Sequence, residues 1–88
     1  MLELEYTTQF KRDLKLSKKR GKNTDKLDPV VDLLLKEKPL PEKYQDHQLS
    51  GNYKDHRECH IESDWLLIYF QGKKVLVLVR TGSHADLF

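Results

Sequence analysis

The chain has 88 residues, of which 34% are charged and 38% are hydrophobic, and its formal net charge at pH 7 is +2. This composition is typical of a folded soluble protein and argues against disorder, and the length predicts one domain over residues 1–88. The single cysteine, Cys59, excludes an internal disulfide and suits a reducing cytoplasm. Neither a signal peptide nor an apolar run of the ~20 residues that span a membrane is present.

The first 22 residues predict a strand followed by a helix. The segment LELEY alternates apolar and acidic residues, as a strand with one wet face does. Thr7 or Thr8 can cap the helix that follows, and Gly21 suits the left-handed turn that ends it.

This first helix is strongly basic. Residues 1–22 hold seven Lys and Arg against three acidic residues, which gives a local charge of +4. Such a surface attracts polyanions with an affinity that falls as the salt concentration rises. A solvated helix face explains the same charges equally well.

An apolar stripe with spacings of three and four residues predicts a second helix, and its members are Leu27, Val30, Val31 and Leu34. Two starts remain open for this helix. Asp25 caps it and Pro29 lies in its first turn, or Asp28 caps it and Pro29 takes the first helical position. The helix ends before KPLP, whose prolines favour an extended path, and a loop then runs to about Gly51.

Three strands are expected after this loop. YKDHRECHI alternates, so that Cys59 lies on one face and Glu58 and His60 on the other. The apolar runs WLLIYF and KVLVLV, separated by QGKK, are typical of a hairpin in the middle of a sheet. The order β-α-α-β-β-β predicts an α+β fold in which two helices pack on one face of a small, mostly antiparallel twisted sheet, while the opposite face stays more open.

Hairpin geometry predicts a cluster of polar residues at one rim of this sheet. The turn IESD joins the end of the first of these strands to the start of the second, so His60 lies close to Asp64. The last strand returns antiparallel to the same rim, where it ends with Arg80 and is followed by His84. His47 lies in the loop that precedes these strands.

Such a cluster contains the groups that RNA cleavage needs without a metal. RNA carries its own nucleophile, the 2′-hydroxyl, and its cleavage requires a base, an acid and a cation at the phosphate. Histidines titrate near neutral pH and can exchange the two protons, while the fork of Arg80 can hold two phosphate oxygens. Trp65 or Phe88 can stack on a splayed base.

Structural roles explain several of these residues as well. Trp65 begins an apolar strand and can belong to the core, Arg80 can pair with Asp64, and Ser83 and Asp86 can cap a final turn. Metal binding is a third interpretation, because zinc ligands are available in His47, His60, Asp64, His84 and Cys59. Their spacing matches no closed zinc motif, and Cys59 faces away from His60.

The order and spacing of these residues resemble the YafQ branch of the RelE-like toxins of bacterial type II toxin–antitoxin systems. The resemblance covers essentially the whole chain and is most specific in YQDHQLSGNYKDHRECHIESDWLLIYF and RTGSHADLF. The residues that carry it are Asp46, His47, Leu49, Gly51, Arg57, His60, Asp64, Trp65, Leu67, Ile68, Tyr69, Arg80, Thr81, Gly82, His84, Leu87 and Phe88.

The resemblance implies a RelE-like fold and an mRNA interferase. Such a toxin is a ribosome-dependent, metal-independent endoribonuclease that cuts mRNA in the ribosomal A site and so inhibits translation. It needs no cofactor and acts in the bacterial cytoplasm. A cognate antitoxin holds it inactive, and operator DNA is bound only through the toxin–antitoxin complex.

Matching positions also imply roles for individual residues. The catalytic set is His47, His60, Asp64 and His84. Within it, His84 is favoured as the general acid, His47 as the general base, and Asp64 as the group that orients a histidine. The residues implied in RNA binding are Arg80 at the scissile phosphate, Trp65, Phe88 and Lys54.

The basic first helix is assigned to ribosome docking, because the ribosome is mostly RNA and binds cations. The lysines implied in this contact are Lys11, Lys15, Lys18 and Lys19. The alternative interpretation is a non-catalytic RNA- or antitoxin-binding module on the same fold. The intact histidine–aspartate set favours the enzyme, because a pure binding module does not need it.

Overall fold

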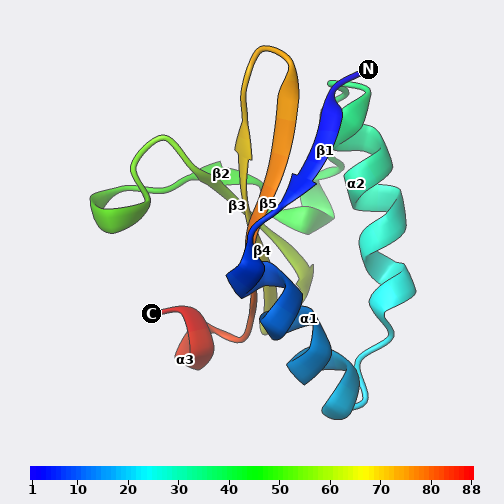
Figure 1. Cartoon of the computed structure of the whole chain (residues 1–88), viewed down its shortest axis with the longest axis vertical. Coiled ribbons are helices and arrows are strands. Elements are labelled where there is room, and N and C mark those ends of the chain that lie inside the picture. Colours follow the sequence, from blue (N-terminus) through cyan, green and yellow to red (C-terminus); the bar gives the residue numbers. More distant parts are fainter.

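A mixed five-stranded sheet with strand order β1-β5-β4-β3-β2 forms the centre of the computed structural model, which describes all residues from 1 to 88 (Figure 1). The strands are β1 (Glu3–Tyr6), β2 (His47–Gln48), β3 (Arg57–Glu62), β4 (Trp65–Gln71) and β5 (Val75–Gly82), and the helices are α1 (Thr8–Lys19), α2 (Leu27–Leu35) and α3 (His84–Leu87). Only β1 and β5 pair in parallel. The predicted α+β fold with a mostly antiparallel sheet is confirmed.

Thr7 connects β1 to α1. Its hydroxyl accepts a hydrogen bond from the Phe10 N–H at 2.9 Å and donates one to the Val79 carbonyl at 2.6 Å. Thr7 is therefore the N-cap, the first of the two predicted candidates. Gly21 closes the other end of α1 with a φ of 84°, as predicted for a left-handed turn.

The start of α2 differs from both predicted starts. Asn23 caps a 3₁₀ turn over Thr24–Lys26, and its side chain accepts a hydrogen bond from the Asp25 N–H at 3.1 Å. This turn runs directly into α2, so the predicted caps at Asp25 and Asp28 are wrong. Pro29 lies in the first turn of the helix, where its missing N–H removes no intrahelical bond.

The sheet has an apolar cluster on each face. Helices α1 and α2 pack on one face, and the buried residues there include Phe10 and Val30 from the helices and Leu67 from β4. On the other face, α3 and the segment 49–53 cover Leu66 and Ile68 (Figure 1). This second face is less open than predicted, because the chain after β5 folds back over it.

None of the three helices combines the length and the apolar character that crossing a membrane requires.

The loop before β3 contains a strand that the sequence did not predict. In β2, His47 lies opposite Glu58 of β3, and Gln48 lies opposite Arg57. A strand of two residues has no alternating pattern to detect. The pairing of β2 with β3 brings His47 to the edge of the sheet.

Helix α3 begins with a capping box, as predicted for Ser83 and Asp86. The Ser83 N–H donates to Asp86 Oδ2 at 3.0 Å, and the Asp86 N–H donates to Ser83 Oγ at 3.2 Å. Arg20, just after α1, also donates to Asp86 Oδ2 at 2.6 Å. Asp86 therefore fixes the helix that carries His84 and ties it to α1.

A fall in pH is expected to weaken the contacts of Asp86 with Arg20 and Ser83. The pKa of Asp86 is lowered from 3.8 to about 2, chiefly by the hydrogen bond from Arg20 and then by that from the Ser83 N–H. Because the folded-state pKa lies below the unfolded one, the Asp86 carboxylate stabilises the fold above pH ~4, and this contribution is lost as the pH falls toward ~2.

Urea unfolding between pH 4 and pH 2 measures this effect. Over that range, the free energy of unfolding of the wild type should fall more steeply than that of Asp86→Asn. Asp28→Asn, a change at an exposed carboxylate without an ion pair, is the control and should keep the wild-type slope. Equal slopes for the wild type and Asp86→Asn would contradict this assignment.

Candidate active site

The rim predicted from hairpin geometry contains a histidine–aspartate pair. Asp64, in the turn between β3 and β4, accepts a hydrogen bond from the His84 N–H at 2.9 Å, and its Oδ1 lies 2.8 Å from His84 Nδ1. These backbone and side-chain hydrogen bonds lower the pKa of Asp64, so it is a carboxylate at neutral pH. A carboxylate can only accept, so Nδ1 of His84 is the donor and Nε2 is left free to exchange a proton.

Three histidine rings form a row beside this pair. The ring centroids of His60 and His84 are 5.8 Å apart, and those of His47 and His60 are 6.3 Å apart. His60 is the central and most buried member, with 16% of its side chain exposed, whereas His47 and His84 are about half exposed. The structure therefore brings together all four members of the predicted catalytic set, because β2 carries His47 to the rim.

Asp46 holds His47 in this place. Its carboxylate accepts hydrogen bonds from Arg57 Nη2 at 3.0 Å and from the Tyr69 hydroxyl at 2.5 Å. The next residue, His47, has Nδ1 2.7 Å from the Gln45 carbonyl oxygen. Because a carbonyl can only accept, Nδ1 of His47 is a donor, and Nε2 is the nitrogen that faces the row.

Glu58 is a residue of this site that was not predicted from the sequence. Its side chain is only 4% exposed, and its Oε1 lies 3.4 Å from His47 Nε2 and 3.9 Å from His60 Nε2. Its other oxygen, Oε2, has no hydrogen-bond partner. The alternation of β3 already placed Glu58 on the face of His60, and this was the signal available. The approach of His47 was not predictable, because it depends on β2.

The structure changes the set of residues that can hold a metal. Ligand atoms of Glu58, His60 and His84 all lie within 4.8 Å of one another, and imidazole with carboxylate suits zinc or copper. Cys59 is buried in the core on the opposite face, so the interpretation that includes Cys59 is wrong.

Arg80 faces the same side of the sheet as Glu58, because both lie opposite Ile68 in the strand register. It does not pair with Asp64, as the structural alternative proposed, but with Asp13 of α1. Nε and Nη2 of Arg80 donate to the two Asp13 oxygens at 3.0 and 3.1 Å. These hydrogen bonds are the main cause of the raised pKa of Arg80, which is a permanent cation at this rim.

The predicted stacking role of Trp65 is wrong. Its side chain is buried, with a relative exposure of 1%, and its Nε1–H donates to Thr81 Oγ1 at 2.9 Å. Trp65 therefore belongs to the core and cannot stack on a base. Phe88 is 65% exposed, and its ring packs edge-on against Tyr53 at 6.0 Å. Lys54 is exposed next to Tyr53, so Phe88 and Lys54 stay available to a ligand.

The lysines assigned to ribosome docking lie on one exposed helix. Each is exposed on α1, and none takes part in an ion pair. These residues are Lys11, Lys15, Lys18 and Lys19. Their charges are therefore not neutralised within the molecule.

Comparison with known proteins places this chain and its fold among the bacterial toxins of type II toxin–antitoxin systems. Residues 2–88 match the family model described as the bacterial toxin of type II toxin–antitoxin system, YafQ. The chain belongs to the YafQ family, which confirms the resemblance.

Three relatives illustrate the similarity. The mRNA interferase toxin YafQ of Escherichia coli K12 is 45% identical over 87 residues, which is 98% of this chain and 95% of the relative. The toxin in the crystal structure of the E. coli DinJ–YafQ complex is 44% identical, with a TM-score of 0.92 over 100% of this chain and 99% of that one. A metal-bound toxin from Helicobacter pylori is 47% identical, with a TM-score of 0.94 over the whole of both chains.

Proposed function

We propose that this protein is an mRNA interferase toxin, an endoribonuclease that cleaves mRNA on the ribosome and is neutralised by a cognate antitoxin. The observation that carries the proposal is the row of three histidines with Asp64 bound to His84. The activity named for the E. coli relative and the DinJ–YafQ complex support the enzyme and the antitoxin. Operator DNA is then contacted only through the toxin–antitoxin complex, and the site of action is the bacterial cytoplasm.

The chemistry uses groups that the rim provides. The 2′-hydroxyl of RNA attacks the adjacent phosphorus, and the bond to the 5′-oxygen of the next nucleotide breaks, which leaves a 2′,3′-cyclic phosphate. Nε2 of His47 takes the proton of the 2′-hydroxyl, and Nε2 of His84 gives a proton to the departing 5′-oxygen. Asp64 orients His84, and the cation of Arg80 stabilises the charged phosphorane. No step needs a metal or another cofactor.

Primer extension on ribosome-bound mRNA, with and without this protein, tests the proposal. Endonucleolytic cleavage should create new 5′ ends within the codon that occupies the A site, and these ends should be absent without the protein. A non-catalytic binding module on the same fold would create no new ends at any concentration. The absence of new ends would therefore favour that alternative.

Ribosome docking is expected to depend on α1. Replacement of Lys15, Lys18 and Lys19 with glutamate should weaken ribosome binding, because three uncompensated cations of this helix become anions. The slope of log binding constant against log salt concentration should become less steep by about 2. Filter binding of the toxin to ribosomes at several salt concentrations measures both quantities.

The matched control carries the same change of charge away from α1. Its three substitutions replace the exposed Lys38, Lys73 and Lys74 with glutamate. This variant should bind more tightly than the α1 variant. If the α1 variant keeps the wild-type affinity and salt dependence, α1 does not dock on the ribosome.

A further inference from the structure

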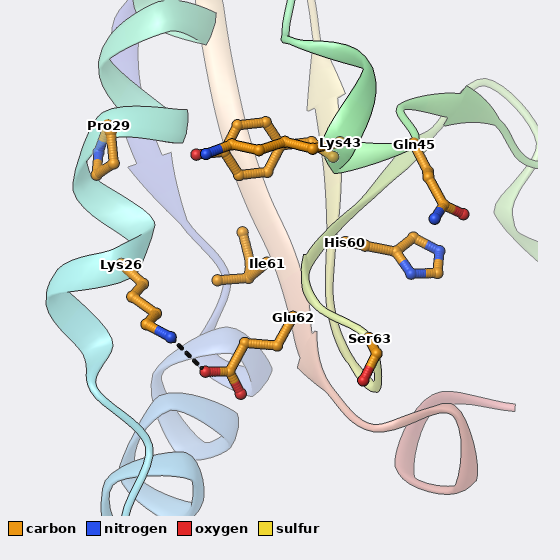
Figure 2. A pocket seen from close by; sticks show the side chains of 9 residues that line it. Lys26, Pro29, Lys43, Gln45, His60, Ile61, Glu62 and Ser63 are labelled. Carbon is orange, nitrogen blue, oxygen red and sulfur yellow. Dashed lines mark hydrogen bonds and ion pairs between the residues drawn. The ribbon is translucent and has the colours of Figure 1, made fainter.

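A pocket adjoins the histidine row at His60. Its volume is about 460 Å³, and it lies between α2, the segment 43–45 and the end of β3. His60 forms part of its wall, with Gln45 and Ser63 on either side of the ring (Figure 2). The proposed mechanism uses none of the other residues that line it.

The pocket has an excess of positive charge. Lys26, from its wall, and Lys22, just outside it, both bind the Glu62 carboxylate, at 2.8 and 2.9 Å (Figure 2). Lys43 has no ion pair, and its ammonium lies 5.1 Å from the centre of the Tyr44 ring. Lys22 and Lys26 therefore share one carboxylate, and Lys43 is free to bind an external anion.

Neutral groups in the same pocket suit a nucleobase. The amide of Gln45 and the hydroxyl of Ser63 both donate and accept hydrogen bonds, which the polar edge of any base requires. Tyr44 adds an aromatic side chain to the same wall, and Lys43 lies over its ring. An anion site beside such groups matches one nucleotide unit, with its phosphate and its base.

We propose that this pocket binds the nucleotide next to the cleaved bond, with a phosphate on Lys43 and Lys26 and the base beside Tyr44, Gln45 and Ser63. This inference rests on the proposed function, because the RNA must already lie across the histidine row. His60 is common to the row and the pocket, so an RNA strand that crosses the row enters the pocket with its neighbouring nucleotide.

Two substitutions with opposite expected effects on RNA affinity test the pocket. The probe is a fluorescent RNA hexamer with 2′-O-methyl groups, which blocks the nucleophile and prevents cleavage. Lys43→Ala should weaken binding about fivefold at 0.1 M salt and make the salt slope less steep by about 0.7, because one phosphate contact on a single strand is lost. Glu62→Gln should tighten binding by a similar factor, because it frees Lys22 and Lys26. Lys73→Ala, at the β4–β5 turn, should leave the affinity unchanged.

The outcomes separate this inference from the proposed function. If the wild type cleaves ribosome-bound mRNA but Lys43→Ala and Glu62→Gln bind the hexamer like the wild type, the pocket is not an RNA subsite. If these variants change the affinity for the antitoxin and not for RNA, the pocket serves the antitoxin and the inference is overturned. If the wild type neither binds nor cleaves RNA, the proposed function and the inference fall together. Thermal unfolding of each variant confirms that it is folded.

Discussion

Replacement of His84 with glutamine is expected to lower the rate of RNA cleavage by about 100- to 10,000-fold, the usual contribution of one general acid or base. Glutamine keeps a polar side chain of similar size, but its amide does not exchange a proton near neutral pH. His84 is half exposed and lies outside the core, so the variant should keep the wild-type stability. Single-turnover cleavage of mRNA on ribosomes measures the chemical step.

Asp64→Asn is the matched control for this result. Asparagine can still accept hydrogen bonds from His84, but it lacks the charge that stabilises the protonated ring. Its cleavage rate should therefore lie between those of the wild type and His84→Gln. Expression without antitoxin should arrest growth for the wild type and not for His84→Gln. Equal arrest by a stably folded His84→Gln would rule out acid–base catalysis by this residue.

Replacement of Asp13 with alanine should lower the free energy of unfolding by about 1–3 kcal/mol, the cost of leaving a buried hydrogen-bond donor without its partner. Its side chain is only 8% exposed, and it accepts hydrogen bonds from Arg80 and from the Thr81 N–H. Its removal leaves the Arg80 guanidinium, 23% exposed, without its counter-ion. Urea unfolding at pH 7 measures the loss.

A double-mutant cycle separates the ion pair from the helix packing around it. The double variant Asp13→Ala with Arg80→Leu should be more stable than Asp13→Ala alone, because it leaves no partly buried charge without a counter-ion. A loss below about 1 kcal/mol in Asp13→Ala, the level of an exposed pair, would show that the pair is solvated.

The central part of the fold could be predicted from the sequence. Two nearly continuous apolar runs with a glycine-containing turn between them define β4 and β5, and both strands lie where they were expected. The alternation of β3 also gave the correct faces for Cys59 and His60. Because adjacent antiparallel strands share their ends, these local patterns were sufficient to bring His60, Asp64 and His84 to one rim.

The remaining parts of the site depend on contacts that no local pattern encodes. Arg80 and Asp13 are 67 positions apart in the sequence. Nothing in the sequence around Asp13 indicates that Arg80 is its partner. Trp65 was ambiguous, because an aromatic residue at the start of an apolar strand suits both the core and a stacking surface. Glu58 became a site residue only when β2 placed His47 opposite to it.

The parallel pairing of β1 with β5 has a consequence for the order of folding. The Thr7 hydroxyl reaches the Val79 carbonyl across 72 positions of sequence, so docking of β1 closes a very long loop. Such closure costs chain entropy and is slow compared with the formation of local hairpins. The strands β3, β4 and β5 pair with segments that are neighbours in the sequence. Arg80 and Asp86, in contrast, bind Asp13 of α1 and Arg20 just after it. The rim is therefore completed only when the two ends of the chain have met.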